Sequence, residues 1–114
     1  MPDETETLLR RMISGDQGAA AAVLAGARTS DAPSLLVAAA LISGDRDGLL
    51  LARAAAHATK TRDRQLVAVA AADLEGNHGL FDALIRDHLA DYPDNVLAAW
   101  IATRHAQRHV PFTH

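Results

Sequence analysis

A short motif built around a glycine occurs three times along the chain. Ile13-Ser14-Gly15-Asp16 returns as Ile42-Ser43-Gly44-Asp45 and, more loosely, as Leu74-Glu75-Gly76-Asn77, with the glycines 29 and 32 residues apart. Each copy follows one apolar stretch of helical period and precedes another. Repetition at this interval is typical of stacked helical hairpins, since one hairpin cannot bury its apolar face alone. The motif therefore predicts an all-α fold.

The composition favours closely packed helices over strands. Alanine accounts for 25 of the 114 residues and aromatic residues for only 4%. Alanine has the highest helix propensity, and its small side chain lets helix backbones approach one another. No segment shows the alternation of apolar and polar residues expected of a half-buried strand.

Caps and breakers divide the chain into about seven helices within one domain, residues 1–114. We expect hairpins over residues 4–28, 32–59 and 62–91, and a last helix over 95–109. Asp16 and Thr61 are the expected N-caps of the second and fifth helices. Three glycines are expected to end helices in the left-handed conformation: Gly15, Gly44 and Gly76.

Part of the chain resembles the tetratricopeptide repeat superfamily. Gly76 and Pro93 have the 17-residue separation of that motif, and Ala20, Leu24 and Ala27 follow Gly15 at its small–large–small positions. Residues 61–101 look more specifically like a segment of tetratricopeptide repeat protein 38-like proteins. The resemblance implies a right-handed solenoid of helical hairpins used for protein or peptide contact, and it brings no catalytic residue.

A non-enzymatic module that binds a protein, a peptide or itself is the function we expect first. The first helix of each hairpin would line a concave surface, which on the third hairpin includes Asp63, Leu66, Ala70 and Asp73. A basic group around the turn between the fourth and fifth helices would suit a carboxylate-bearing partner: Arg53, Arg62 and Arg64. Nucleic acid is not expected, because the net charge is −3 and no aromatic residue is interleaved with these arginines.

The alternative is a small helical enzyme or ligand-binding protein with a histidine and carboxylate pocket. His105 and His109 are four residues apart, so both rings could face one metal ion, with a third ligand from His114, Asp91 or Asp94. Two arginines beside these histidines favour a solvated helix end instead, and we expect no metal and no cofactor. Isolated histidines are expected at the surface or an interface (His57, His78, His88), and the aspartates of 82–94 on a solvated face.

Self-association is expected at the end of the chain. Trp100 and Ile101 give the last helix an apolar side, and Phe112 follows it without an obvious partner. An open apolar end of a helical stack is covered by a cap or by another subunit. We therefore expect a homodimer with Trp100, Ile101 and Phe112 at or near its interface.

The compartment expected from the sequence is the cytoplasm. The first residues are acidic, whereas a secretory signal starts with basic residues and an apolar run. No apolar stretch approaches the roughly 20 residues of a membrane span, so no membrane partner is expected. The chain has no cysteine, which excludes disulfides and thiolate chemistry.

Overall fold

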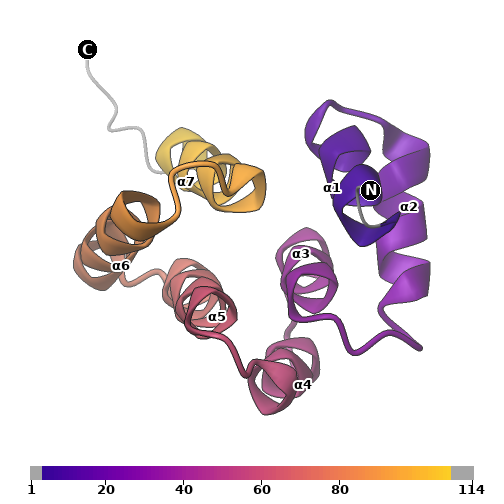
Figure 1. Cartoon of the computed structure of the whole chain (residues 1–114), viewed down its shortest axis with the longest axis horizontal. Helices are drawn as coiled ribbons and strands as arrows, with labels where there is room; N and C mark the ends of the chain where they lie inside the picture. Colours follow the sequence, from indigo (N-terminus) through magenta and orange to yellow (C-terminus); the bar gives the residue numbers. More distant parts are fainter. Residues whose placement is uncertain (1–3, 109–114) are drawn as a thin grey trace.

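A computed structural model describes residues 4–108, and this part of the chain is all-α, as predicted (Figure 1). Seven helices follow one another without an intervening strand in the described range. They are α1 (Glu4–Ile13), α2 (Gln17–Gly26), α3 (Pro33–Ser43), α4 (Leu49–His57), α5 (Thr61–Glu75), α6 (His78–Asp91) and α7 (Val96–Arg108).

The helix ends are set largely by local capping. Gly15, Gly44 and Gly76 have φ angles of 98°, 82° and 72°, which confirms the three predicted left-handed glycines. The carboxylate of Asp16 accepts a hydrogen bond from the Ala19 amide at 3.1 Å, as expected of an N-cap. The prediction for Thr61 was wrong, because Lys60 occupies the extended cap position and Thr61 is already the first helical residue.

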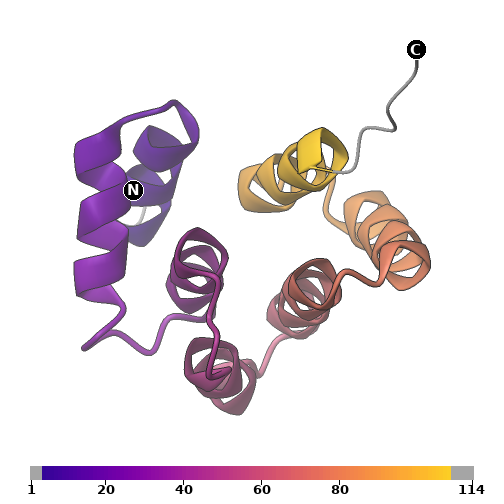
Figure 2. The ribbon, with the colours of Figure 1, turned by 180° about the vertical axis from the view of Figure 1, so that it is seen from behind.

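The helices pair as hairpins around one core. α1 packs on α2, α3 on α4 and α5 on α6, while α1, α3, α5 and α7 contact each other in turn. α3 lies at the centre: every residue from Leu35 to Leu41 is buried. Figures 1 and 2 show α2, α4 and α6 on the outside of this inner set of helices.

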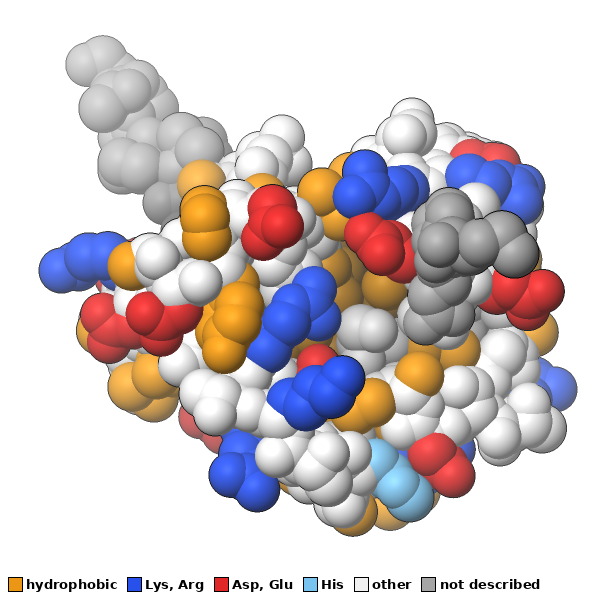
Figure 3. Space-filling view, viewed as in Figure 1, with side chains coloured by type: hydrophobic (Ala, Val, Ile, Leu, Met, Phe, Trp, Pro, Cys, Tyr) orange, Lys and Arg blue, Asp and Glu red, His pale blue; other side chains and the backbone are white. Residues whose placement is uncertain are grey.

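α7 folds back far enough to contact α1 as well as α5 and α6. The inner helices α1, α3, α5 and α7 therefore form a closed arc, in which the first helix contacts the last. The space between them is reduced to a recess of about 130 Å³. Figure 3 shows this narrow hollow with hydrophobic side chains at its bottom. Residues from the first turns of α1, α3, α5 and α7 line it. They include Thr5, Glu6, Ser34, Arg62 and Val96.

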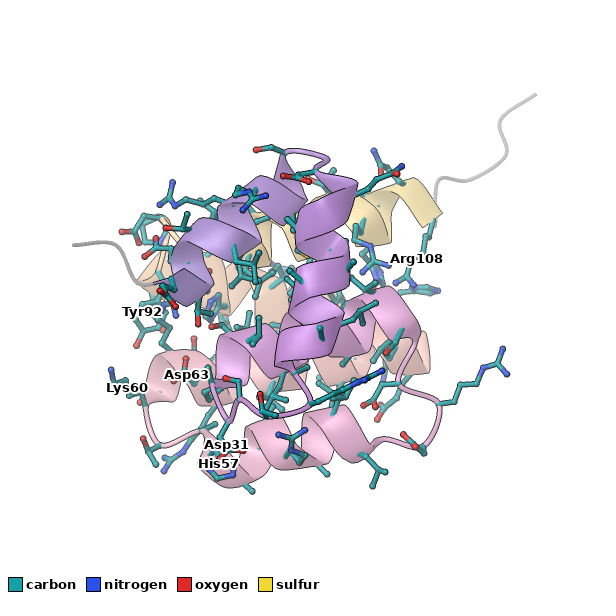
Figure 4. All side chains as sticks on the ribbon, turned by 90° about the vertical axis from the view of Figure 1, so that its right-hand side faces the viewer. Asp31, His57, Lys60, Asp63, Tyr92 and Arg108 are labelled. Atoms are coloured by element: carbon teal, nitrogen blue, oxygen red, sulfur yellow. The ribbon has the colours of Figure 1, made fainter. Side chains whose placement is uncertain are left out.

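α2 departs from the direction of the other helices. In Figure 1 it runs across the view, whereas α3 to α7 are seen nearly end-on, and Figure 4 shows it steeply inclined to α3 and α4. α2 packs on α1 and α3, and α4 packs on α3 and α5. α2 is inclined to α3 and α4 and does not run alongside them. An open groove lies between α2 and α4 on the outer side of the molecule. None of the described helices has the length and hydropathy needed to cross a bilayer.

Candidate functional site

The groove between α2 and α4 has a volume of about 590 Å³. Its floor comes from α3 and its end from the connection between α3 and α4. Volumes of this order are typical of binding clefts. The lining residues with apolar side chains are Leu24, Ala27, Ala39, Leu49 and Leu50.

Two exposed leucines mark the groove. Leu49 is 62% exposed and Leu24 37% exposed, and together with Leu80 they are the exposed large hydrophobic residues of the described chain. Leu80 lies on α6, away from the groove. Scattered single leucines are ordinary on a protein surface, whereas Leu24 and Leu49 line one groove together.

The carboxylates beside the groove are used by the start of α4. Asp45 has a positive φ of 41° and accepts hydrogen bonds from the amides of Leu50 and Leu51, both at 3.0 Å. Asp47 accepts one from the Leu49 amide at 3.3 Å. Gly48, which precedes α4, has no side chain to cap the helix. The carboxylates of Asp45 and Asp47 accept hydrogen bonds from the free amides of the first turn in its place.

The cations beside the groove fall into two kinds. Arg53 donates hydrogen bonds to the carbonyls of Ala27 at 2.7 Å and Ser30 at 2.9 Å, and it contacts Asp31 at 3.3 Å. Arg28 and Arg46 are exposed and make no ion pair with any residue of 4–108. The lining of the groove thus carries three arginines and two aspartates, a net charge of +1 in a chain whose net charge is −3.

The predicted basic group is divided by the fold. Arg53 lines the groove, whereas Arg62 lines the small inner recess and contacts Asp63 at 3.7 Å. Arg64 donates a hydrogen bond to the carbonyl of Ala58 at 3.2 Å, at the turn between α4 and α5. The three arginines therefore do not form one site. In Figure 4 Asp31 and His57 lie side by side at the end of α4, and Oδ1 of Asp31 is 3.5 Å from Nε2 of His57.

The predicted concave binding surface on α5 was wrong. Leu66 and Ala70 are fully buried and Asp73 is 3% exposed, because α3 and α7 pack against this face of α5. Asp63 is half-buried and contacts Arg62. The prediction assumed an open stack, and the contact between α7 and α1 closes it.

Asp73 holds the end of α7. Its Oδ1 atom lies 2.7 Å from Nδ1 of His105 and also contacts the guanidinium of Arg108. The His105 ring stacks on Phe81 with centroids 3.8 Å apart, and its Nε2 lies 3.2 Å from Nδ1 of His78. The expectation of a solvated helix end was thus wrong for His105, which is 6% exposed.

His88 is completely buried, so its expected place at the surface was also wrong. Its Nδ1 lies 2.9 Å from Oε1 of Gln65, and its Nε2 lies 2.9 Å from Nδ2 of Asn95. Burial and the positive charge of Arg62 lower the pKa of His88 below its usual value, against a smaller opposing effect of Asp91. His88 is therefore neutral and hydrogen-bonded on both sides at neutral pH.

A signal for these buried polar residues was present in the helical spacing. Asp73 falls seven residues after Leu66, and His88 falls seven after Phe81, on faces whose other members are apolar. His105 follows Ile101 by four. Residues separated by four or seven share one face of a helix, so each polar residue belonged to the buried face of its helix.

Metal-binding and interface candidates have a mixed outcome. Within residues 4–108, no three histidine, aspartate or glutamate side chains are arranged to hold a metal ion; His109 and His114 lie outside the described residues.

Ile101 is fully buried, which contradicts its assignment to an interface with a second copy. Trp100 is half-buried beneath the guanidinium of Arg104, 4.7 Å from the ring centroid. Phe112 also lies outside the described residues.

Comparison of the chain with protein-family models, with curated proteins and with solved structures finds no match. The function must therefore be inferred from the residues and the geometry described above.

Proposed function

We propose that this chain is a non-enzymatic interaction module that binds an acidic, amphipathic segment of a partner protein in the groove between α2 and α4. The observation that supports the proposal is the pair of exposed leucines, Leu24 and Leu49, on one groove of 590 Å³. Its architecture would be a tetratricopeptide-like stack of right-handed hairpins. The pairing of α1 with α2, α3 with α4 and α5 with α6 supports that proposal, and the contact between α7 and α1 shortens the stack into a closed arc.

The chemistry of the groove defines the partner. Apolar side chains of the partner would cover Leu24, Leu49 and Leu50, since removal of about 25 cal/mol per Å² of apolar surface from water supplies most of the affinity. Carboxylates on the flanks of the same segment would pair with Arg28 and Arg46. An amphipathic helix with leucines at every third or fourth position and glutamates beside them has both features.

A designed peptide of that pattern tests the proposal directly. A fluorescently labelled peptide with leucines on one face and flanking glutamates is titrated with the protein, and its anisotropy is measured. A second peptide has lysine in place of each glutamate and keeps the leucines. We expect saturable binding of the acidic peptide, and binding of the lysine peptide at least tenfold weaker.

Two leucine variants separate the groove from the rest of the surface. Leu49→Lys places a charge in the groove, whereas Leu80→Lys alters an exposed leucine on α6, 44% exposed, outside it. Neither side chain is buried, so neither variant removes core packing. We expect Leu49→Lys to weaken peptide binding at least tenfold and Leu80→Lys to leave it unchanged. Equal effects of the two variants, or equal binding of both peptides, would contradict the proposal.

The histidine and carboxylate alternative has its nearest counterpart in Asp73, His105 and His78. Asp73 and His105 are buried, and their contacts attach α7 to α5. His105 is also covered on one face by the Phe81 ring. We therefore propose a structural role for this cluster.

A further inference from the structure

Five groups form a continuous hydrogen-bond chain from the surface of α6 to the start of α7. Asp91 accepts a hydrogen bond from Nε2 of Gln65 at 3.3 Å, and Gln65 in turn contacts His88. His88 contacts Asn95, whose Oδ1 atom lies 3.5 Å from the Ala98 amide. Asn95 is the residue before α7, and its carbonyl also accepts from the Ala99 amide. The chain thus ends on the N-terminal cap of α7.

One carboxylate determines the polarity of every bond in this chain. An ionised carboxylate only accepts, so Gln65 directs its amide nitrogen at Asp91 and its oxygen at His88. Nδ1 of His88 must then donate, which leaves Nε2 as an acceptor for the amide nitrogen of Asn95. Asn95 consequently presents its oxygen to the first turn of α7, as a helix cap requires.

A second proton on His88 is incompatible with this arrangement. It would place an N–H of the imidazolium 2.9 Å from the amino group of Asn95, so two donors would face each other. Rotation of the Asn95 amide would give His88 an acceptor, but it would turn the amino group toward the Ala98 amide and remove the cap. His88 is fully buried, so water cannot supply the missing acceptor without an opening of the structure.

We infer that His88 and Asn95 form an acid-sensitive latch, in which protonation of His88 releases the N-terminal end of α7 from the rest of the fold. α7 contacts α1, α5 and α6, so its release would open the closed arc of inner helices. The other end of α7 stays attached through the contacts of His105 and Arg108 with Asp73 on α5. Release therefore begins at Ala98 and Ala99.

The charged groups near His88 agree with this direction. Arg62 on α5 disfavours a positive charge on His88, Asp91 on its own helix favours one more weakly, and α7 presents the uncharged Asn95. Burial also opposes the charge and lowers the pKa of His88. A histidine with a lowered pKa in the docked state binds its proton more readily once released. The docked state is thus fully favoured above about pH 6.5 and is weakened as pH falls below it.

Amide hydrogen exchange followed by NMR tests the latch at single residues. Below pH 6.5 the equilibrium for release shifts by up to about tenfold per pH unit for one neutral buried histidine. Between pH 7.0 and 5.5 we expect the protection factors of Ala98 and Ala99 to fall severalfold to tenfold, while those of α5 stay unchanged. Equal loss of protection in both helices, or no loss in α7, would overturn the inference.

Asn95→Asp is the decisive variant. An aspartate still caps α7, but both of its oxygens accept, so it favours the protonated form of His88. We expect the imidazole titration midpoint of His88 to lie below 6.5 in the native sequence and to rise in this variant, with the acid sensitivity of α7 lost. His57→Gln is the control, because His57 is an exposed histidine that contacts Asp31 and no group of the latch, and it should leave the sensitivity intact. A native midpoint at or above 6.5, or an unchanged response in Asn95→Asp, would refute the latch.

Discussion

The carboxylate of Asp73 is the most buried acidic group of the described chain, and its neighbours decide whether it stabilises the fold. His105 is buried with it, whereas the side chain of Arg108 is 41% exposed and its attraction is weakened by solvent. The Oδ2 atom of Asp73 has no hydrogen-bond partner within residues 4–108. The close bond to His105 is thus the main compensation for burying this charge.

Removal of that carboxylate should destabilise the protein. Asp73→Ala removes the carboxylate that accepts the hydrogen bond from Nδ1 of the buried His105, and we expect a loss of about 2 kcal/mol in the free energy of unfolding. Asp87→Ala changes an exposed aspartate on α6 and should stay within about 0.5 kcal/mol of the native sequence. Urea unfolding of the two variants measures the difference. Equal stabilities would mean that Asp73 does not hold α7.

Gly76 tests the backbone conformation at a helix end. Its φ is 72°, and a β-carbon built at this position would meet no atom within 4 Å, so substitution strains the backbone without a clash. We expect Gly76→Ala to cost about 1 kcal/mol. Gly79→Ala is the matched control, because Gly79 is helical and equally open. It should leave the melting temperature unchanged or raise it; a loss as large as that of Gly76→Ala would contradict the cap.

At the scale of single elements, the helix boundaries could be predicted because their signals are local. Gly44 ends α3 and Asp16 begins α2 through contacts with residues three or four positions away. The start of α4 was harder, because Asp45 caps it from five residues before Leu50. Helical spacing groups Leu66, Ala70 and Asp73 on one face of α5, but it does not show that α3 and α7 both pack against that face, since this depends on how α7 returns to the same core.

Arg53 connects α4 to the segment between α2 and α3, and this connection can be tested. Lysine at this position keeps the charge but cannot reach both carbonyls of Ala27 and Ser30 with one planar group. We expect Arg53→Lys to lower the free energy of unfolding by about 1 kcal/mol and to increase hydrogen exchange in α4. Arg46→Lys, at an exposed arginine that makes no ion pair within 4–108, should have no effect. Equal protection of α4 in both variants would argue against the connection.

At the scale of the whole molecule, the groove could not be predicted from the sequence. The hairpin pattern gives the ranges of the helices but not the angle at which α2 packs on α3. α2 is steeply inclined to α3 and α4, and the groove that Leu24 and Leu49 line lies between α2 and α4. The same regular pattern predicted an open concave side, which the contact between α1 and α7 closes.

Self-association belongs to this scale as well. Because Ile101 is buried, Trp100 is the described residue of the predicted interface that can contact a second copy. We expect a homodimer at micromolar concentration that Trp100→Ala weakens and Leu49→Lys leaves intact, as measured by sedimentation equilibrium. A monomer would refute the dimer. Dissociation by Leu49→Lys would place a second copy in the groove and contradict the proposed partner.

Chemical-shift mapping tests the central claim most directly. The ¹⁵N-labelled protein is titrated with the acidic amphipathic peptide, and the perturbed amides are compared with the residues of the groove and of the inner recess. The account predicts that the largest shifts fall on Leu24, Arg28, Arg46, Leu49 and Leu50, around the groove, while Ser34, Arg62 and Val96 around the inner recess are unaffected. Shifts centred on the recess, or no shifts at peptide concentrations up to about 1 mM, where even weak specific binding is visible, would contradict it.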